Sequence, residues 1–223
     1  MRLFVLGATG RTGAELIDLG LARGHDITAF VRSPQKITRK DPRLRVVKGD
    51  PLDGGQVASV LCGHDVVLSA LGPTVGEAMH RTTLLQDCAA TALTAMASVK
   101  VHRFLVVSSA LLFPGGGAGA AFFRWLIRHH LRDAEAMERL VAESAAAWTI
   151  ARPPRLVDAR DERYRAKVDG LPDGVAMMAA RLSWRAVAAF LLDAVGGDYT
   201  RRVVGLSRIL AKGSRDCSRR KIS

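Results

Sequence analysis

The sequence is poor in cysteine, and the cysteines that it has show no functional spacing. Only three occur in 223 residues, at positions 62, 88 and 217, and none forms a Cys-x-x-Cys pair. This pattern argues against a disulfide framework or a zinc site and favours a reducing, cytoplasmic compartment. The adjacent His129 and His130 lack other metal-type ligands at a useful spacing. We therefore expect no metal site.

Long apolar runs are also missing. The apolar run behind Arg2 covers only residues 3–6 before a glycine interrupts it, which does not resemble a secretory signal. No stretch approaches the length of about 20 residues that a membrane-spanning helix requires. We expect no membrane span. Hydrophobic residues make up 48% of the chain, enough for one domain with a substantial core.

Acidic residues are too few to balance the basic ones. The chain has 33 Lys and Arg against 21 Asp and Glu, a formal net charge of +12. Much of the excess lies near the end, where we expect residues 213–223 to form a basic, disordered tail. Such a tail can contact nucleic acid or anionic lipid, although a solvated terminus is the simpler interpretation. No nucleic-acid-binding motif indicates a specific nucleic-acid partner.

Glycine is concentrated near the start, where residues 1–13 read MRLFVLGATGRTG. A short apolar strand there runs into glycines at G-x-x-G-x-x-G spacing, and a helical pattern follows. Such a turn leaves the backbone N–H groups at the helix start open to a pyrophosphate. The predicted phosphate-binding residues are Gly7, Ala8, Thr9, Gly10, Arg11, Thr12 and Gly13.

Short apolar strands then alternate with helical patterns along the chain. The predicted strands cover residues 3–6, 26–31, 43–48, 65–70, 103–107 and 148–151, with two shorter ones at 163–168 and 201–205. The predicted helices cover residues 11–23, 78–98, 120–143 and 184–195, with a flexible link over 113–119. This order predicts an α/β fold with a doubly wound parallel sheet, a small C-terminal substrate lobe, and a ligand at the carboxyl ends of the strands.

The end of the second predicted strand lacks the acid that usually holds the ribose of NAD(H). Arg32, Ser33 and Lys36 stand there instead, and they suit a 2′-phosphate. The sequence therefore favours NADP(H), although Arg32 and Lys36 also fit an ordinary solvated loop. Asp50, after the third strand, is either an adenine partner or a turn former. Ala70, Leu71 and Gly72, after the fourth strand, are expected to pass beside the cofactor riboses.

At this point the chain resembles a known group. GATGRTG at residues 7–13, VRSPQK at 31–36, Gly49-Asp50 and WTIARPPRL at 148–156 are similar to the atypical short-chain dehydrogenase/reductases that bind NAD(P)H. The nearest branches are the biliverdin-IXβ/flavin reductase-like and the NmrA-like proteins.

The resemblance spans about residues 1–206. It implies an NAD(P)-binding Rossmann-like domain, placed here over residues 1–212, and a reductase of flavins, quinones or other planar conjugated substrates. Ser109 matches a serine that lies near the nicotinamide and the substrate in that group. Ser108 follows the predicted strand over residues 103–107, and Pro153 follows the one over residues 148–151. These two residues complete the predicted cofactor site.

Two departures from the family pattern bear on catalysis. Arg155 replaces a histidine of the flavin reductases, and it either steadies negative charge on a reduced ring or pairs with Asp158 or Asp161. The Tyr-x-x-x-Lys acid pair is absent: residues 120–143 contain neither residue, and the chain's tyrosines, Tyr164 and Tyr199, have no lysine four residues on. Alcohol–ketone interconversion is therefore not expected, whereas hydride transfer to a conjugated acceptor remains feasible.

The remaining candidate side chains have open interpretations. An aromatic group comprises Phe113, Phe122, Phe123 and Trp125, which are read as a water-excluding cover, as core, or as a dimer surface. Asp133 and Glu138 are expected to pair with Arg132, Arg139 or Arg152 rather than to act as an acid or base.

The function predicted from the sequence is an NADPH-dependent reductase that passes a hydride to a planar acceptor near Ser109, Leu112, Phe113 and Arg155. The alternative is a non-catalytic NADP(H)-sensing regulator of the NmrA-like type. A sugar-nucleotide epimerase or dehydratase is a third, weaker hypothesis because little chain follows the sixth strand. The protein is expected to be a monomer or a homodimer.

Overall fold

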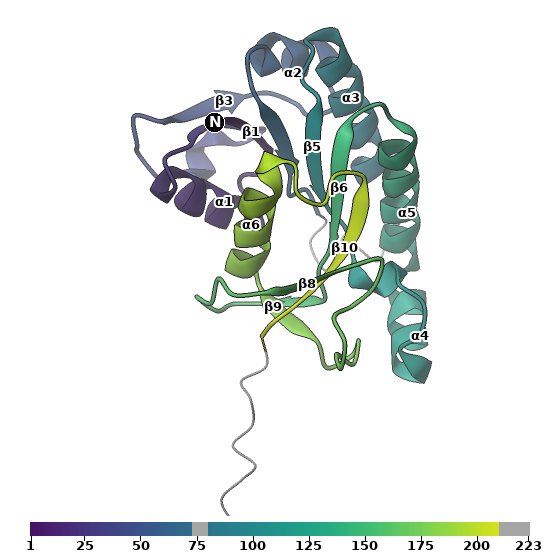
Figure 1. Ribbon diagram of the computed structural model, residues 1–223. Helices are drawn as coiled ribbons and strands as arrows, with labels where there is room; N and C mark the ends of the chain where they lie inside the picture. The colour runs from purple at the N-terminus through teal and green to yellow at the C-terminus, as the bar shows by residue number, and fades with distance from the viewer. Residues whose placement is uncertain (73–79, 210–223) are drawn as a thin grey trace, which may run out of the picture.

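The computed structural model describes residues 1–72 and 80–209 (Figure 1). The basic tail over residues 213–223 and the first residues of the predicted 78–98 helix lie outside these ranges. The domain boundary at residue 212 therefore stays a prediction.

The core of the protein is an eight-stranded sheet in the order β3-β2-β1-β4-β5-β6-β10-β8. Every neighbouring pair is parallel except β10 and β8. The first six strands follow the doubly wound order of dinucleotide-binding domains, which confirms the predicted α/β Rossmann-like fold. The strands are β1 (Arg2–Leu6), β2 (Asp26–Val31), β3 (Leu44–Lys48), β4 (Val66–Ser69), β5 (Arg103–Val107), β6 (Ala147–Arg152), β8 (Arg165–Val168) and β10 (Arg202–Ser207).

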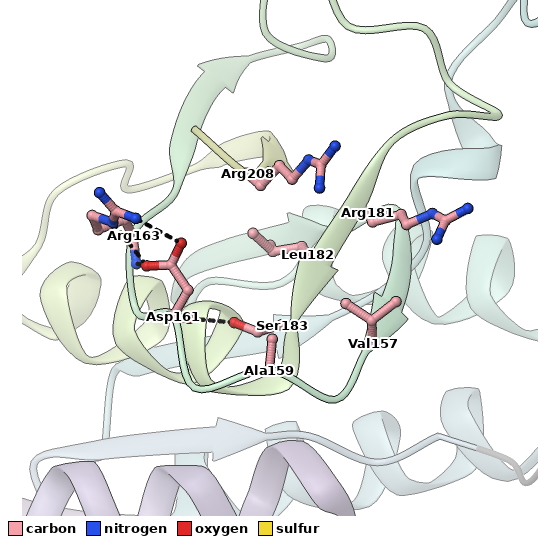
Figure 2. Close-up of a pocket in the computed structure, with 8 residues that line it drawn as sticks. All are labelled: Val157, Ala159, Asp161, Arg163, Arg181, Leu182, Ser183 and Arg208. Atoms are coloured by element: carbon pink, nitrogen blue, oxygen red, sulfur yellow. Dashed lines mark hydrogen bonds and ion pairs between the residues drawn. The ribbon is translucent and has the colours of Figure 1, made fainter. Parts of the chain in front are cut away.

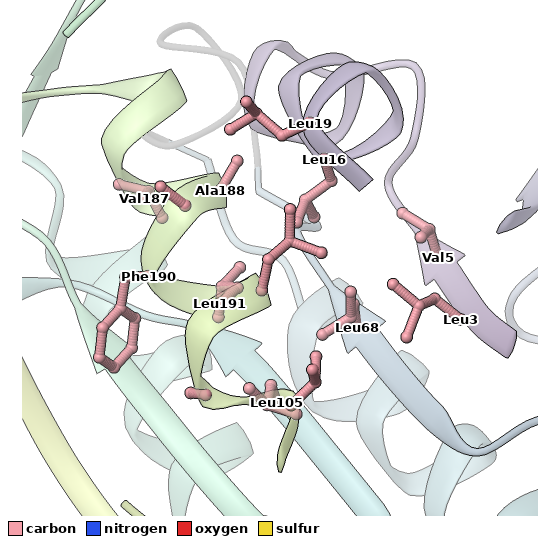
Figure 3. Close-up of a cluster of buried hydrophobic side chains, with 14 of the residues drawn as sticks. Leu3, Val5, Leu16, Leu19, Leu68, Leu105, Val187, Ala188, Phe190 and Leu191 are labelled. Carbon is pink, nitrogen blue, oxygen red and sulfur yellow. The ribbon is translucent and has the colours of Figure 1, made fainter. Parts of the chain in front are cut away.

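Helices cover both faces of the sheet, because its central strands are apolar on both sides. On one face α1 (Arg11–Ala22) packs beside α6 (Trp184–Asp193), and Figure 3 shows their leucines meeting those of β1, β4 and β5. On the other face lie α2 (Gly54–Leu61), α3 (Leu84–Ser98) and α5 (Arg128–Glu143). A separate two-stranded parallel sheet, β7 (Arg155–Val157) with β9 (Arg181–Ser183), forms the small lobe.

The structure corrects several element boundaries. The predicted helix over residues 120–143 is two helices, α4 (Gly117–Leu126) and α5, separated at Ile127 with φ −105° and ψ 28°. Helix α5 packs on α3, whereas α4 projects below α5 (Figure 1). The two helices therefore do not form one continuous helix. Gly115, Gly116 and Gly117 all have positive φ, and the predicted 113–119 link is shortened by the start of α4.

Short elements were missed by the sequence analysis. Helix α2 begins behind Asp53, whose side chain accepts a hydrogen bond from the Gln56 N–H at 3.0 Å. The predicted helix over residues 184–195 ends at Asp193 and continues as a single 3₁₀ turn, η4 (Ala194–Gly196). None of the helices within the described ranges has the length and apolar composition that a bilayer crossing demands.

Candidate functional site

The turn between β1 and α1 can be built only with glycine. Gly7 has φ +77°, and a Cβ there would lie 2.7 Å from the carbonyl carbon of Ala70, the residue that follows β4. A Cβ on Gly13 would lie 2.2 Å from the Gly7 carbonyl oxygen. The Gly10 N–H donates to that same oxygen at 2.9 Å and closes the turn. Crowding of the backbone therefore explains both glycines.

The start of α1 is open and positively polarised. Gly10 caps the helix without a side-chain hydrogen bond, and the first turn carries no acidic residue. Thr9, Gly10 and Arg11 are exposed, whereas Ala8 and Thr12 are buried. The Arg11 guanidinium lies 4.4 Å from the ring centre of Trp184 and adds a cation beside the helix start. Open N–H groups, the helix dipole and this cation suit a linked pair of phosphates.

A pocket of about 310 Å³ lies where β2 and β3 end. Its lining residues are Arg32, Lys48, Gly49, Asp50 and Gln56. A Cβ on Gly49 would lie 2.1 Å from the Phe30 ring, so this floor also needs glycine. Lys48 and Gln56 were missed by the sequence analysis. Lys48 was detectable from strand alignment, because it stands beside Val31 in the β2–β3 register.

Of the other residues predicted to hold the adenosine end of the cofactor, one lines this pocket and two do not. Asp50 lines the pocket and also forms a turn, since its Oδ1 accepts from the Leu52 N–H at 3.0 Å. Ser33 and Lys36 belong to the following 3₁₀ turn, where the Lys36 N–H donates to the Ser33 carbonyl at 3.2 Å. Neither lines the pocket, so Arg32 and Lys48 are the cations that the fold places there.

The chain that follows β4 passes beside the glycine turn, and its predicted place next to the cofactor riboses stays a prediction. The Ala70 N–H donates to the Leu6 carbonyl at 3.0 Å, and Gly7 packs against the peptide between Ala70 and Leu71. Gly72 is exposed and is the last residue described before residue 80. These three residues thus lie next to the open start of α1.

The ends of β5 and β6 are joined by backbone hydrogen bonds that bring Ser108, Ser109 and Pro153 together. The Ser108 N–H donates to Ala151 at 2.7 Å, and the Ala110 N–H donates to Pro153 at 2.9 Å. The Ser108 hydroxyl donates to Glu138 at 2.5 Å, so its proton is committed. The Ser109 hydroxyl oxygen accepts from the Leu111 N–H at 3.3 Å. Ser109 therefore keeps its proton for a ligand.

Glu138 of α5 pairs with Arg152 at the end of β6, as predicted. Arg152 donates twice to this carboxylate, at 2.9 Å and 2.5 Å, and its guanidinium lies 4.6 Å from the Phe113 ring centre. Phe113 is buried, so the core interpretation holds for it, whereas the other three aromatics are exposed. The prediction for Asp133 was wrong, because its carboxylate accepts from the N–H groups of Leu85 and Gln86, both at 3.0 Å.

Arg155 lies two residues beyond Pro153, where the small lobe begins, and its predicted role beside the serines stays a prediction. Arg155 is exposed at the start of β7, where it stands opposite Arg181, and it makes no hydrogen bond to Ser109 within the described residues. The suggested pairing with Asp161 is also wrong, since that carboxylate accepts from Arg163 at 2.9 Å. A role for Arg155 near the reacting atoms thus lacks a supporting contact.

The small lobe carries a second pocket, of about 270 Å³, that the sequence analysis missed (Figure 2). Val157, Ala159 and Leu182 give it an apolar wall, while Arg181 and Arg208 supply positive charge. Its residues come from three separate stretches of chain, so no local sequence signal marks it.

Tyr164 is engaged away from the serines. Its hydroxyl donates to Asp193 at 2.6 Å, and its ring packs edge-on against Phe190 of α6. Burial, together with this carboxylate, raises the pKa of Tyr164. The backbone carbonyl of the other tyrosine, Tyr199, accepts from Thr149 at the opposite end of β6. The Tyr199 ring also packs against Phe190, so both tyrosine side chains contact α6.

The doubly wound sheet, the glycine turn and the polar pocket beyond β2 together define a dinucleotide-binding protein of the Rossmann type. The chain belongs to the NAD(P)H-binding family, whose model matches residues 7–197. This match confirms the resemblance to the NAD(P)H-binding short-chain dehydrogenase/reductases, and a nicotinamide dinucleotide is the family's cofactor.

Individual relatives are distant. An uncharacterised chloroplastic protein of Arabidopsis thaliana is 29% identical over 68% of this chain and 58% of its own length. The oxidoreductase ordB of Dothistroma septosporum is 32% identical over 48% of this chain and 45% of its own length. The chain thus spans about half the length of these relatives. A short-chain dehydrogenase/reductase from Veillonella parvula, solved with NADP, superposes with a TM-score of 0.73, 20% identity, and 93% and 94% of the two chains covered.

Proposed function

We propose that the protein is an NADPH-dependent reductase of a flavin, a quinone or a similar planar acceptor. The observation that carries this proposal is a glycine turn open for a dinucleotide, in a chain whose two tyrosine rings both pack against Phe190 of α6. An oxidoreductase and an NADP-bound short-chain dehydrogenase/reductase among the similar proteins support the reaction class.

The charges around the second strand favour the phosphorylated dinucleotide. Arg32 and Lys48 line the pocket beyond β2 and β3, and the single carboxylate in its lining, Asp50, already accepts a backbone hydrogen bond. A 2′-phosphate gains from two cations, whereas a free 2′-hydroxyl needs an acceptor. The N–H groups at the start of α1 would hold the pyrophosphate.

The residues at the ends of β5 and β6 suit an acceptor that needs little acid catalysis. A bound nicotinamide supplies hydride chemistry, and a conjugated acceptor takes up the electrons within its own ring system. Ser109 is positioned to donate a hydrogen bond to such an acceptor, because its own oxygen is held by the Leu111 N–H. Ser108 is a positioning residue, since Glu138 and Arg152 fix its hydroxyl.

The test is NADPH oxidation by the purified protein in the presence of FMN or a soluble quinone. We expect an acceptor-dependent rate above the acceptor-free background. Gly13→Val, which fills the cradle, should abolish NADPH binding and the rate together. Ser109→Ala should lower the rate while NADPH binding persists. If no member of a broad acceptor panel raises the rate, the enzymatic proposal fails.

A second candidate is an NADP(H)-sensing regulator, favoured by the committed proton of Ser108 and by the exposed position of Arg155. Such a protein must bind the oxidised and reduced dinucleotides with different affinities, because equal binding shifts no equilibrium. Titration calorimetry with NADP⁺ and NADPH separates the cases. Unequal affinities without any turnover would favour the regulator, and equal affinities would reject it.

A further inference from the structure

Helix α4 presents an aromatic cluster to solvent that the proposed reductase function does not use. Phe122, Phe123 and Trp125 are 57%, 43% and 60% exposed. Their rings touch one another, with centroids 5.8 Å apart for the two phenylalanines and 6.2 Å for Phe122 and Trp125. Contiguous exposed aromatics of this size mark a surface that another molecule covers.

The aromatic face is held outward by specific contacts. Arg124 donates to the carbonyls of Leu111 at 2.8 Å and Phe113 at 2.6 Å, which ties α4 to the end of β5. Ala120, in the first turn of α4, is fully buried. In Figure 1, α4 projects from the body of the protein below α5. The exposed rings are therefore a property of a packed helix.

Positive charge continues directly from the aromatic cluster into α5. The Arg128 guanidinium lies 5.4 Å from the Trp125 ring centre and donates to the Trp125 carbonyl at 3.0 Å. One turn on, Arg132 and His129 line a pocket of about 380 Å³ together with Arg81 and Thr82. Burial, and then these surrounding cations, lower the pKa of His129.

Two carboxylates of α3 and α5 are engaged by other groups. Asp133 is buried and accepts from the first N–H groups of α3, and Asp87 accepts from the Thr83 hydroxyl at 2.7 Å. Within the described residues, Arg128 and Arg132 form no ion pair. The contact between Trp125 and Arg128 joins the two helices across the break at Ile127, and Arg132 follows one turn along α5. Phe122, Trp125, Arg128 and Arg132 are called the stripe below.

We propose that this stripe docks the protein on an anionic lipid surface. Aromatic rings partition into the boundary between headgroups and acyl chains, and arginines beside them meet lipid phosphates. An anionic lipid surface supplies the phosphates that Arg128 and Arg132 can meet, whereas a second copy of the chain would bring further arginines to this surface. The overall charge of +12 complements an anionic membrane.

The docking surface lies on the same edge of the sheet as the candidate cofactor site, because α4 follows the carboxyl end of β5. A docked protein would present that edge to the membrane and to apolar molecules dissolved in it. The proposal stands without the reductase function, and its test requires no turnover.

The experiment is vesicle binding by the full chain, with phosphatidylcholine vesicles compared to vesicles that also contain phosphatidylglycerol. Trp148 is buried and Trp184 half-buried, so a fluorescence change reports mainly on Trp125. We expect a blue shift with the anionic vesicles that Trp125→Phe removes. The double variant F122S/W125S lacks this tryptophan, so its binding is measured by co-sedimentation with the vesicles and should be about tenfold weaker. Arg128→Gln and Arg132→Gln should each cost about fivefold on anionic vesicles only.

Matched controls are Leu52→Ser and Arg45→Gln, which change an exposed apolar and an exposed basic residue far from the stripe. Circular dichroism spectra and melting temperatures equal to those of the unchanged protein show that all variants are folded. Vesicle binding that F122S/W125S leaves intact would assign it to the basic tail and overturn the proposal. Failure to bind vesicles, or a dimer in solution that F122S/W125S dissociates, would also overturn it.

Discussion

Arg32 directly follows the last residue of β2 and lines the pocket together with Lys48 and Asp50. The guanidinium is exposed, and the backbone beside it is fixed by the Gly49 N–H, which donates to the Val31 carbonyl at 3.0 Å. A planar guanidinium in this place matches a phosphate on the adenosine ribose far better than it matches a hydroxyl.

Replacing Arg32 by alanine should weaken NADPH binding by about 1.5–3 kcal/mol, the value of a charge-assisted contact, and should change NADH binding little. Titration calorimetry with each dinucleotide measures both losses. Lys36→Ala is the matched control, because this exposed cation lies outside the pocket lining. If Arg32→Ala lost the same binding free energy for NADPH and for NADH, the proposed contact of Arg32 with the 2′-phosphate would be contradicted.

At the scale of the element, helix α3 depends on a residue of another helix. Asp133 of α5 is buried and accepts from the Leu85 and Gln86 N–H groups in the first turn of α3. The carboxylate thereby serves as a cap supplied from 47 residues along the chain. Removing it leaves two N–H groups without their acceptor at the helix start.

Asp133→Ala should lower the free energy of unfolding by about 2 kcal/mol, which combines the loss of a cap with the loss of charge-assisted hydrogen bonds. Urea denaturation followed by circular dichroism measures the change. Asp87→Ala in the same helix turn is the control, because Asp87 is exposed and its partner is a nearby threonine. A loss no larger than that of the control would show that the cap is dispensable.

At the scale of the whole molecule, Arg103 joins distant parts of the fold. It is a buried arginine at the start of β5. It donates to the Ala147 carbonyl at 2.6 Å, the Thr149 hydroxyl at 2.8 Å and the Ala194 carbonyl at 2.6 Å. The last of these lies at the end of α6, so one side chain joins the central sheet to a helix that is 91 residues distant in sequence.

Arg103→Met should therefore destabilise the protein by about 3 kcal/mol, because it removes several charge-assisted hydrogen bonds and leaves carbonyls without donors. Thermal and urea unfolding both report this loss. Arg202→Met, at an exposed position of β10, is the matched control and should change stability little. If both variants unfold alike, the junction contributes nothing specific.

The sequence by itself determined the alternation of strands and helices and the glycine turn, since these follow from local hydrophobic patterning and from backbone crowding. The sequence also pointed to Arg32 as a cation at the end of the second strand and showed that no Tyr-x-x-x-Lys pair is present, because both depend only on which residue stands at each position. Only the tertiary structure decided where long-range partners meet. It placed the Asp133 carboxylate at the start of α3 and paired the Ser108 hydroxyl with Glu138, because such contacts join segments whose relative positions are fixed by packing.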